Sequence, residues 1–363
     1  MELWQQELTQ CVRTIDQLER YLPIANREAL KQVIKNMRLA ITPHTLKLID
    51  FTDPMDPIFL MTVPQEAELR ITPEELVDPI GDESKSPVPF LTHRYPDRVL
   101  VYASFSCSAY CRFCFRRFKT GQATPGPSES DVDRICLYLQ SHPEVDEVIL
   151  TGGDPLTLMD GQLELLLKKL RAVPSIIRIR IHTRVPVNLP VRITPELVKL
   201  FRRYMDELHP IFVVTHFNHP RELAKENIQA LARLIDAGIV VRNQSVLLRG
   251  VNDSVKVLRA LFKSLTNIRV LPYYLHQLDL ARGTGHFRVP LEQGIELMRE
   301  LQGSITGIAL PKYMLDIPGG KGKTPLQHQY LTKSGMQAYQ VENYLGEIFS
   351  YSEPETSACA QLA

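Results

Sequence analysis

The chain has 363 residues, of which 44% are hydrophobic and 23% are charged, and its formal net charge at pH 7 is +1. This length and composition suit a globular protein with one large domain and appendages, or with two domains. A net charge near zero gives no global reason to expect nucleic acid as a partner. The chain has no run of 18 apolar residues, and its start, MELWQQELTQ, is unlike a signal peptide. We therefore expect a cytoplasmic protein that does not enter a membrane.

Residues 1–50 carry apolar side chains at helical spacing, such as Leu8, Cys11, Ile15 and Leu18, and this pattern predicts a helical appendage. From residue 51 onward, proline-rich turns predict an irregular linker that wraps over the core and carries no recognisable motif. We expect an N-terminal helical region with its linker at 1–93, a core at 94–290 and a C-terminal region at 291–363.

The core shows alternating strand and helix patterns, which are typical of parallel βα units. The predicted strands are 99–105, 146–151, 176–182, 211–216, 239–247 and 268–275. The amphipathic helices between them include 163–170, 195–204, 228–237 and 255–265. Six units are too few for a closed eight-stranded barrel, so the pattern predicts an α/β fold with an open, partial (β/α)6 TIM-like barrel.

Polar residues lie toward or just after the carboxyl end of each predicted strand, where parallel α/β sheets bind ligands. We expect them to form one site. These residues include the segment from Cys107 to Arg117, the turn Gly152-Gly153-Asp154, His182, His216, Gln244 and Asp279.

Three of the six cysteines, Cys107, Cys111 and Cys114, lie within eight residues in a C-x3-C-x2-C pattern. A structural zinc site needs four ligands, usually as two separated pairs, and the sequence has no second pair. A four-iron cluster held by three thiolates keeps one iron open to a small molecule. The pattern therefore favours a [4Fe-4S] cluster that takes part in chemistry.

A second motif is the segment DIPGGKGKTP at 316–325. A phosphate-binding P-loop needs a glycine five residues before Gly322, where Ile317 stands, so a nucleotide triphosphatase is a distant alternative. A lysine between flexible glycines suits covalent attachment of pyridoxal phosphate. Lys321 and Lys323 are the two candidates.

The segment CSAYCRFCFRR resembles the radical S-adenosylmethionine superfamily, and in particular its lysine 2,3-aminomutase branch. The resemblance extends from about Arg94 to Pro325 through runs such as TGGDPL, THFNHP and PYYLHQLD. It implies a radical SAM partial barrel whose [4Fe-4S] cluster is held by the three cysteines. It also implies roles in binding S-adenosylmethionine, with its amino group received by the Gly-Gly-acidic motif and its nucleoside contacted from two further strands: Gly152, Gly153, Asp154, His216 and Gln244.

The same resemblance implies that Lys323 carries pyridoxal phosphate, although Lys321 replaces a family glycine. Residues Arg94, Tyr95 and Arg98 match the family segment near the cofactor and are candidate phosphate ligands, a task that suits the arginine fork. Arg116 matches the arginine that receives the substrate carboxylate. Asp279 and Asp316 match the two aspartates that bind the ε-ammonium group of lysine.

The implied activity is that of an L-lysine 2,3-aminomutase, an isomerase that interconverts L-α-lysine and β-lysine. The alternatives are an aminomutase for another cationic amino acid such as arginine, and a non-catalytic iron–sulfur protein that carries electrons or regulates. The expected partners are the free amino acid, an electron donor such as flavodoxin or ferredoxin, and further copies of the chain. Zinc-binding family members have a C-terminal cysteine cluster, whereas this chain has only Cys359 there, so we do not expect zinc.

Overall fold

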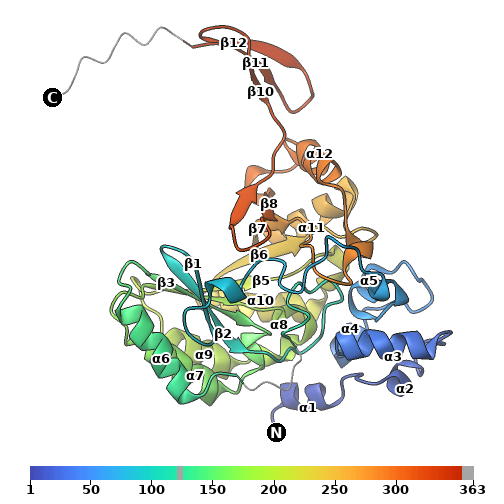
Figure 1. Cartoon of the computed structure of the whole chain (residues 1–363), viewed down its shortest axis with the longest axis vertical. Helices are drawn as coiled ribbons and strands as arrows, with labels where there is room; N and C mark the ends of the chain where they lie inside the picture. Colours follow the sequence, from blue (N-terminus) through green and yellow to red (C-terminus); the bar gives the residue numbers. More distant parts are fainter. Residues whose placement is uncertain (121–125, 354–363) are drawn as a thin grey trace.

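The computed structural model describes residues 1–120 and 126–353. Its centre is one open nine-stranded sheet, with strands in chain order from β1 to β9 (Figure 1). Neighbours from β2 to β8 are parallel, and β1 and β9 pair antiparallel at the two edges. The strands are β1 (Leu91–Tyr95), β2 (Arg98–Ser104), β3 (Glu147–Gly152), β4 (Arg178–His182), β5 (Ile211–Thr215), β6 (Val240–Val246), β7 (Leu271–His276), β8 (Lys312–Asp316) and β9 (Lys323–Pro325).

The predicted α/β partial barrel is confirmed, with one more parallel strand than the six expected. The addition is β8, which pairs with β7 and extends the sheet past residue 290. All six predicted strands are present, with ends shifted by three residues at most. The two edge strands of the open sheet, β1 and β9, are joined by one hydrogen bond. The backbone N–H of Lys323 on β9 donates to the Tyr95 hydroxyl on β1 at 2.8 Å.

Helices cover the outer face of the sheet and bury its apolar core against it (Figure 1). Helix α9 shows why they form: Thr194 caps its start by accepting from the Leu197 N–H, and Leu197, Leu200 and Phe201 are buried on one side. The other long helices are α6 (Glu129–Gln140), α7 (Asp160–Arg171), α10 (Lys225–Asp236), α11 (Val255–Asn267) and α12 (Leu291–Leu301); α9 spans Pro195–Arg203.

Side chains alternate across the sheet, as the period of two requires. On β4, Ile179 and Ile181 are buried in the core shared with the helices. Arg180 and His182 therefore face the inner, concave side of the sheet. The interior of this half-barrel is consequently polar, which suits a site for charged ligands.

The N-terminal region is helical, as predicted, with α1 (Leu3–Thr9), α2 (Ile15–Leu18), α3 (Arg27–Asn36), α4 (Pro43–Leu46) and α5 (Pro57–Thr62). It forms a second apolar cluster that includes Met61 and Val63 from its own side and Phe113 and Phe287 from the barrel. The linker was expected to carry no functional motif, yet two of its acidic residues, Glu68 and Asp82, reach buried arginines of the barrel. Folding gives the linker a role in positioning the site.

Glu68 lies at the centre of a buried ionic triad with Arg112 and Arg117. Its carboxylate accepts from Arg112 Nε at 2.9 Å and from Arg112 Nη2 at 2.7 Å. Arg117 Nη2 reaches the same carboxylate at 2.5 Å. Since both arginines flank Cys114 in sequence, the triad anchors the cysteine loop to the linker.

We predict that Glu68→Gln lowers the free energy of unfolding by about 3–5 kcal/mol, because it leaves two buried guanidinium groups without a full counter-charge. Thermal or denaturant unfolding measures this loss. The matched control is Glu28→Gln, which removes an exposed ion pair with Lys31 and is expected to cost less than about 1 kcal/mol. Equal effects of the two substitutions would contradict an anchoring role for Glu68.

A separate three-stranded sheet, with β10 (Leu331–Lys333), β11 (Ala338–Glu342) and β12 (Ile348–Ser352), stands away from the barrel in Figure 1. Cys359 lies outside the described residues. Across residues 1–120 and 126–353, every helix is too short or too polar to cross a membrane.

Candidate active site

The cysteine loop follows β2 directly and is held by backbone bonds to the N-terminal region. The Arg112 N–H donates to the Met61 carbonyl at 2.9 Å, and the Tyr110 N–H to the Ala40 carbonyl at 3.3 Å. Cys107, Cys111 and Cys114 are all half-buried free thiols. Burial, and then the neighbouring charges of Asp154 and the other two cysteines, raise the pKa of Cys107. Cys107 and Cys114 both pack against the small apolar cluster of Met37, Ala40 and Tyr110.

These cysteines fit an iron–sulfur cluster better than a single metal ion. Among the residues that the structure describes, no three His, Cys, Asp or Glu side chains gather around one point, as a lone ion requires. A four-iron cluster takes each thiolate on a different iron, so its ligands need only surround the cluster. Three soft sulfur donors on one loop meet that requirement.

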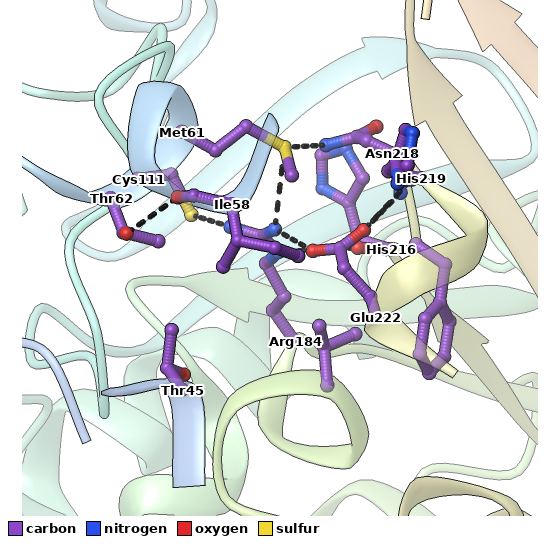
Figure 2. Close-up of polar contacts among 12 residues, drawn as sticks. Thr45, Ile58, Met61, Thr62, Cys111, Arg184, His216, Asn218, His219 and Glu222 are labelled. Atoms are coloured by element: carbon purple, nitrogen blue, oxygen red, sulfur yellow. Dashed lines mark hydrogen bonds and ion pairs between the residues drawn. The ribbon is translucent and has the colours of Figure 1, made fainter. Parts of the chain in front are cut away.

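Arg184 links the cysteine loop to the ends of β4 and β5 (Figure 2). Its Nη1 donates to Cys111 Sγ at 2.7 Å, its Nη2 pairs with Glu222, and its Nε donates to the His216 carbonyl at 3.2 Å. This contact puts a buried positive charge directly at one sulfur of the cysteine loop. The position of Arg184 at the end of a predicted strand placed it among the expected polar residues of the site, but no motif indicated its role or that of Glu222.

Gly152 and Gly153 bring the end of β3 against the cysteine loop. Gly152 has φ +112°, and a Cβ atom there would lie 2.4 Å from the Ser104 carbonyl oxygen. A Cβ on Gly153 would lie 2.3 Å from the Ser106 carbonyl oxygen. Only glycine allows this approach of the two backbones.

Asp154 is held in place by the chain's own donors. Its carboxylate, which we predict to receive an ammonium group, accepts from Thr183 Oγ1 at 2.7 Å and from the N–H groups of Leu156, Arg184 and Val185 at 3.0, 2.6 and 3.1 Å. In this structure Asp154 ties the end of β3 to the turn after β4.

His216 and Gln244 lie at the carboxyl ends of the neighbouring strands β5 and β6, as predicted. Burial lowers the pKa of His216 well below its ordinary value, so the ring is neutral at pH 7. Its Nε2 atom is buried and has no hydrogen-bond partner within the described residues. Such an atom fits a ligand that supplies a donor or an acceptor.

The second centre is the hairpin between β8 and β9, in which Asp316 and Lys323 face each other in register. Lys323 Nζ donates to Asp316 Oδ1 at 2.5 Å. The Ile317 N–H donates to the Gly322 carbonyl at 2.9 Å and closes the hairpin. Lys321 in the loop is exposed. Of the two candidate lysines, Lys323 is therefore the one that faces the interior.

Two carboxylates meet beside Lys323. Burial and then the charge of Asp316 raise the pKa of Asp279. Asp316 is buried too, but hydrogen bonds from His276 and Lys323 outweigh burial and lower its pKa. An acidic pair of this kind, enclosed and unequal in proton affinity, favours a bound cation.

The segment from Arg94 to Arg98 also lies at this centre. Arg98 stacks over the Tyr95 ring, with its guanidinium carbon 3.9 Å from the ring centroid, and pairs with Asp97 at 2.6 Å. Tyr95 touches the Lys323 backbone. Arg94 Nη2 donates to the Ile80 carbonyl at 2.6 Å and to Asp82 at 2.8 Å, and its Nη1 lies 4.0 Å from Asp316.

Arg116 reaches from the cysteine loop toward the second centre. It contacts Asp82 through Nε at 3.1 Å and Nη2 at 3.0 Å, and its Nη1 donates to Thr151 Oγ1 at 3.2 Å. Burial and then the charges of Arg180, Arg116 and Lys323 lower the pKa of His182 on β4. His182 is the last residue of β4 and faces the concave interior of the sheet. Asp82 was missed, since nothing in its local sequence distinguishes it from a turn residue.

Comparison with known proteins agrees with this geometry. Residues 101–261 match the model of the Radical SAM superfamily, and residues 298–362 match that of Lysine-2,3-aminomutase. The SuiB protein of Streptococcus suis, solved with S-adenosylmethionine, is 16% identical with a TM-score of 0.48 over 61% of this chain and 51% of that one. The family match over residues 101–261, together with the barrel and its cysteine loop, defines a radical SAM protein, a class that uses S-adenosylmethionine and an iron–sulfur cluster.

The L-lysine 2,3-aminomutase of Clostridium subterminale is 42% identical over 97% of this chain and 84% of its own. That of Bacillus subtilis is 40% identical over 97% of this chain and 74% of its own. The glutamate 2,3-aminomutase of Clostridioides difficile is 37% identical over 96% and 82%. The chain belongs to the lysine 2,3-aminomutase family and is an isomerase.

Proposed function

We propose that this chain is an L-lysine 2,3-aminomutase that interconverts L-α-lysine and β-lysine. The observation that carries the proposal is the arrangement of opposite charges around one interior. The acidic pair Asp279 and Asp316 lies beside Lys323, and Arg116 approaches from the cysteine loop. These groups match a substrate that has a carboxylate at one end and an ammonium group at the other.

The acidic pair supports lysine as the substrate over glutamate. An ammonium group removed from water needs anionic partners, and Asp279 and Asp316 supply two. A glutamate side chain in the same place would put a third carboxylate beside them, with a large electrostatic cost in a buried site. Arg116 is proposed to receive the α-carboxylate through its planar fork.

The proposed cofactors are a [4Fe-4S] cluster on Cys107, Cys111 and Cys114, S-adenosylmethionine at that cluster, and pyridoxal phosphate on Lys323. When bound, they supply a radical that removes hydrogen from the substrate and a ring that holds the migrating amino group. The residues proposed to hold the phosphate are Arg94, Tyr95 and Arg98. The residues proposed to line the S-adenosylmethionine site are Gly152, Gly153, Asp154, His216 and Gln244.

The chain's own residues bind, orient and shield the reactants. Arg184 keeps positive charge at Cys111. The neutral His216 ring adds an unpartnered buried nitrogen without adding charge. The N-terminal helices cover the cysteine loop with the apolar cluster around Met61 and Phe113, which excludes water.

The remaining proposals concern the setting of the enzyme. A flavodoxin or ferredoxin is the proposed electron donor, because a cluster that drives radical formation has to be reduced first. A cytoplasmic location fits free lysine as a substrate. A homo-oligomer is the proposed assembly, supported by the apolar side chains exposed on the β10–β12 sheet, such as Leu331, Phe349 and Tyr351.

Product analysis tests the activity. The cluster is reconstituted without oxygen, and the protein is incubated with pyridoxal phosphate, S-adenosylmethionine, reductant and, in separate reactions, lysine, arginine, glutamate or ornithine. We expect β-lysine from lysine as the dominant product. A β-amino acid from glutamate, or none from any substrate while 5′-deoxyadenosine accumulates, would contradict the substrate assignment.

A further inference from the structure

We propose that Asp82 is a positioning residue that fixes the guanidinium group of Arg116 for the substrate carboxylate. The inference rests on the proposed function, because it takes Arg116 as the group that receives this carboxylate. Asp82 belongs to the linker, outside the radical SAM barrel. Its proposed role is to set how strongly the site prefers a substrate with an α-carboxylate over an analogue without one.

Asp82 is held rigidly in a buried turn, with a relative exposure of 1%. Its N–H donates to Asp78 Oδ1 at 3.0 Å, and its carbonyl accepts from Ser86 Oγ at 2.8 Å. The preceding Gly81 lies against the glycine loop before Lys323, since a Cβ atom on Gly81 would be 2.5 Å from Gly320 N. The Asp82 carboxylate therefore has a set position relative to both parts of the second centre.

Each of the two carboxylate oxygens of Asp82 contacts a different arginine. Oδ1 accepts from Arg94 Nη2 at 2.8 Å. Oδ2 contacts both Nε and Nη2 of Arg116, at 3.1 and 3.0 Å. Because one oxygen contacts two nitrogens of the same planar group, the plane of that guanidinium is defined as well as its distance.

This arrangement keeps part of the Arg116 fork available. A guanidinium group has five N–H donors. Asp82 takes the Nε side, and Thr151 accepts one bond from Nη1. One further N–H on each of the two terminal nitrogens is left to donate to a carboxylate.

The negative charge of Asp82 also reduces the repulsion between Arg94 and Arg116. Without its carboxylate, Arg94 and Arg116 would be two neighbouring buried cations. Arg94 also lies 4.0 Å from Asp316 through Nη1, so Asp82 joins a series of alternating charges: Arg116, Asp82, Arg94, Asp316 and Lys323. Repulsion between the two arginines would turn the Arg116 fork out of its plane.

The test compares lysine with lysine amide, which differs in having a neutral amide in place of the α-carboxylate. The measured quantity is the ratio of the inhibition constant of lysine amide to the KM of lysine. We expect Asp82→Asn to lower this ratio about tenfold, mainly through the KM of lysine, while cluster iron and bound pyridoxal phosphate are kept. The matched control is Glu83→Gln, an exposed neighbour that pairs only with Lys119 among the ion pairs of the described residues and is expected to leave the ratio unchanged.

Asp82→Glu separates position from charge and covers the case in which Asp82→Asn does not fold. It keeps the negative charge but moves the carboxylate by one methylene, so the ratio should still fall. An unchanged or larger ratio in Asp82→Glu would overturn the proposal. Arg116→Gln tests the underlying assignment separately: if it leaves the ratio at the wild-type value, Arg116 is not the carboxylate site and the proposed function is at fault. If the ratio falls in Arg116→Gln but not in the Asp82 variants, the proposed function stands and only the role of Asp82 is rejected.

Discussion

Replacing Lys323 with alanine should abolish covalent attachment of pyridoxal phosphate and lower β-lysine formation by on the order of 10³-fold or more. The reason is geometric: Lys323 faces the interior from β9, and its amino group already lies at Asp316, 2.5 Å from Oδ1. Borohydride reduction of the holoenzyme, followed by peptide mass mapping, identifies the modified lysine. The iron–sulfur absorbance should not change, because the cysteine loop contains none of these atoms.

Lys321→Ala is the matched control for that experiment. Lys321 lies in the same loop but is exposed, so its removal should leave both attachment and activity close to those of the wild-type protein. Reduced cofactor on Lys321, or normal attachment in Lys323→Ala, would transfer the role to another lysine. The comparison thus decides between the two candidates that the glycine-rich loop offers.

Cys111→Ser should lose most of the cluster iron and all measurable activity, since serine oxygen is a poor substitute for the soft thiolate that iron–sulfur clusters require. The loss should also remove the sulfur partner of Arg184. Iron and sulfide analysis after anaerobic reconstitution measures the effect. Pyridoxal phosphate should still attach to Lys323, which separates damage at one centre from general misfolding.

Cys136→Ser provides the control, because Cys136 lies on α6, on the outer face of the sheet, and contacts the Lys169 carbonyl instead of the cysteine loop. It should keep full iron content and activity. A cluster that persists in Cys111→Ser would show that Cys111 is not a ligand, and the assignment of the C-x3-C-x2-C motif would have to change.

Together these predictions treat the site as two centres that share one interior. The cysteine loop and the β8–β9 hairpin are far apart in the chain. Burial has the largest influence on the pKa of both His182 and Asp279, and the charge of Arg116 acts to lower both. Because of this coupling, substitutions at the boundary between the centres, such as those at Asp82, should change substrate discrimination more than they change either cofactor.

Much of this molecule is determined by local sequence. The period-two and helical patterns predicted the parallel strands and their helices, since apolar side chains must reach a core whatever the fold around them. The C-x3-C-x2-C spacing predicted the soft-metal loop because its ligands lie within eight residues. The lysine between glycines was recognisable for the same reason: the whole motif lies in one short hairpin.

Other features arise only when distant segments pack together. The turn after β4 brings three donors to the Asp154 carboxylate, from Thr183, Arg184 and Val185, and nothing in the sequence around Asp154 indicates them. Glu68 and Asp82 stand in a proline-rich linker that has no motif, and they matter because folding buries them against arginines of the barrel. A sequence shows which side chains can bear charge or bind metal, whereas the partner that each buried charge must find is decided by tertiary contacts.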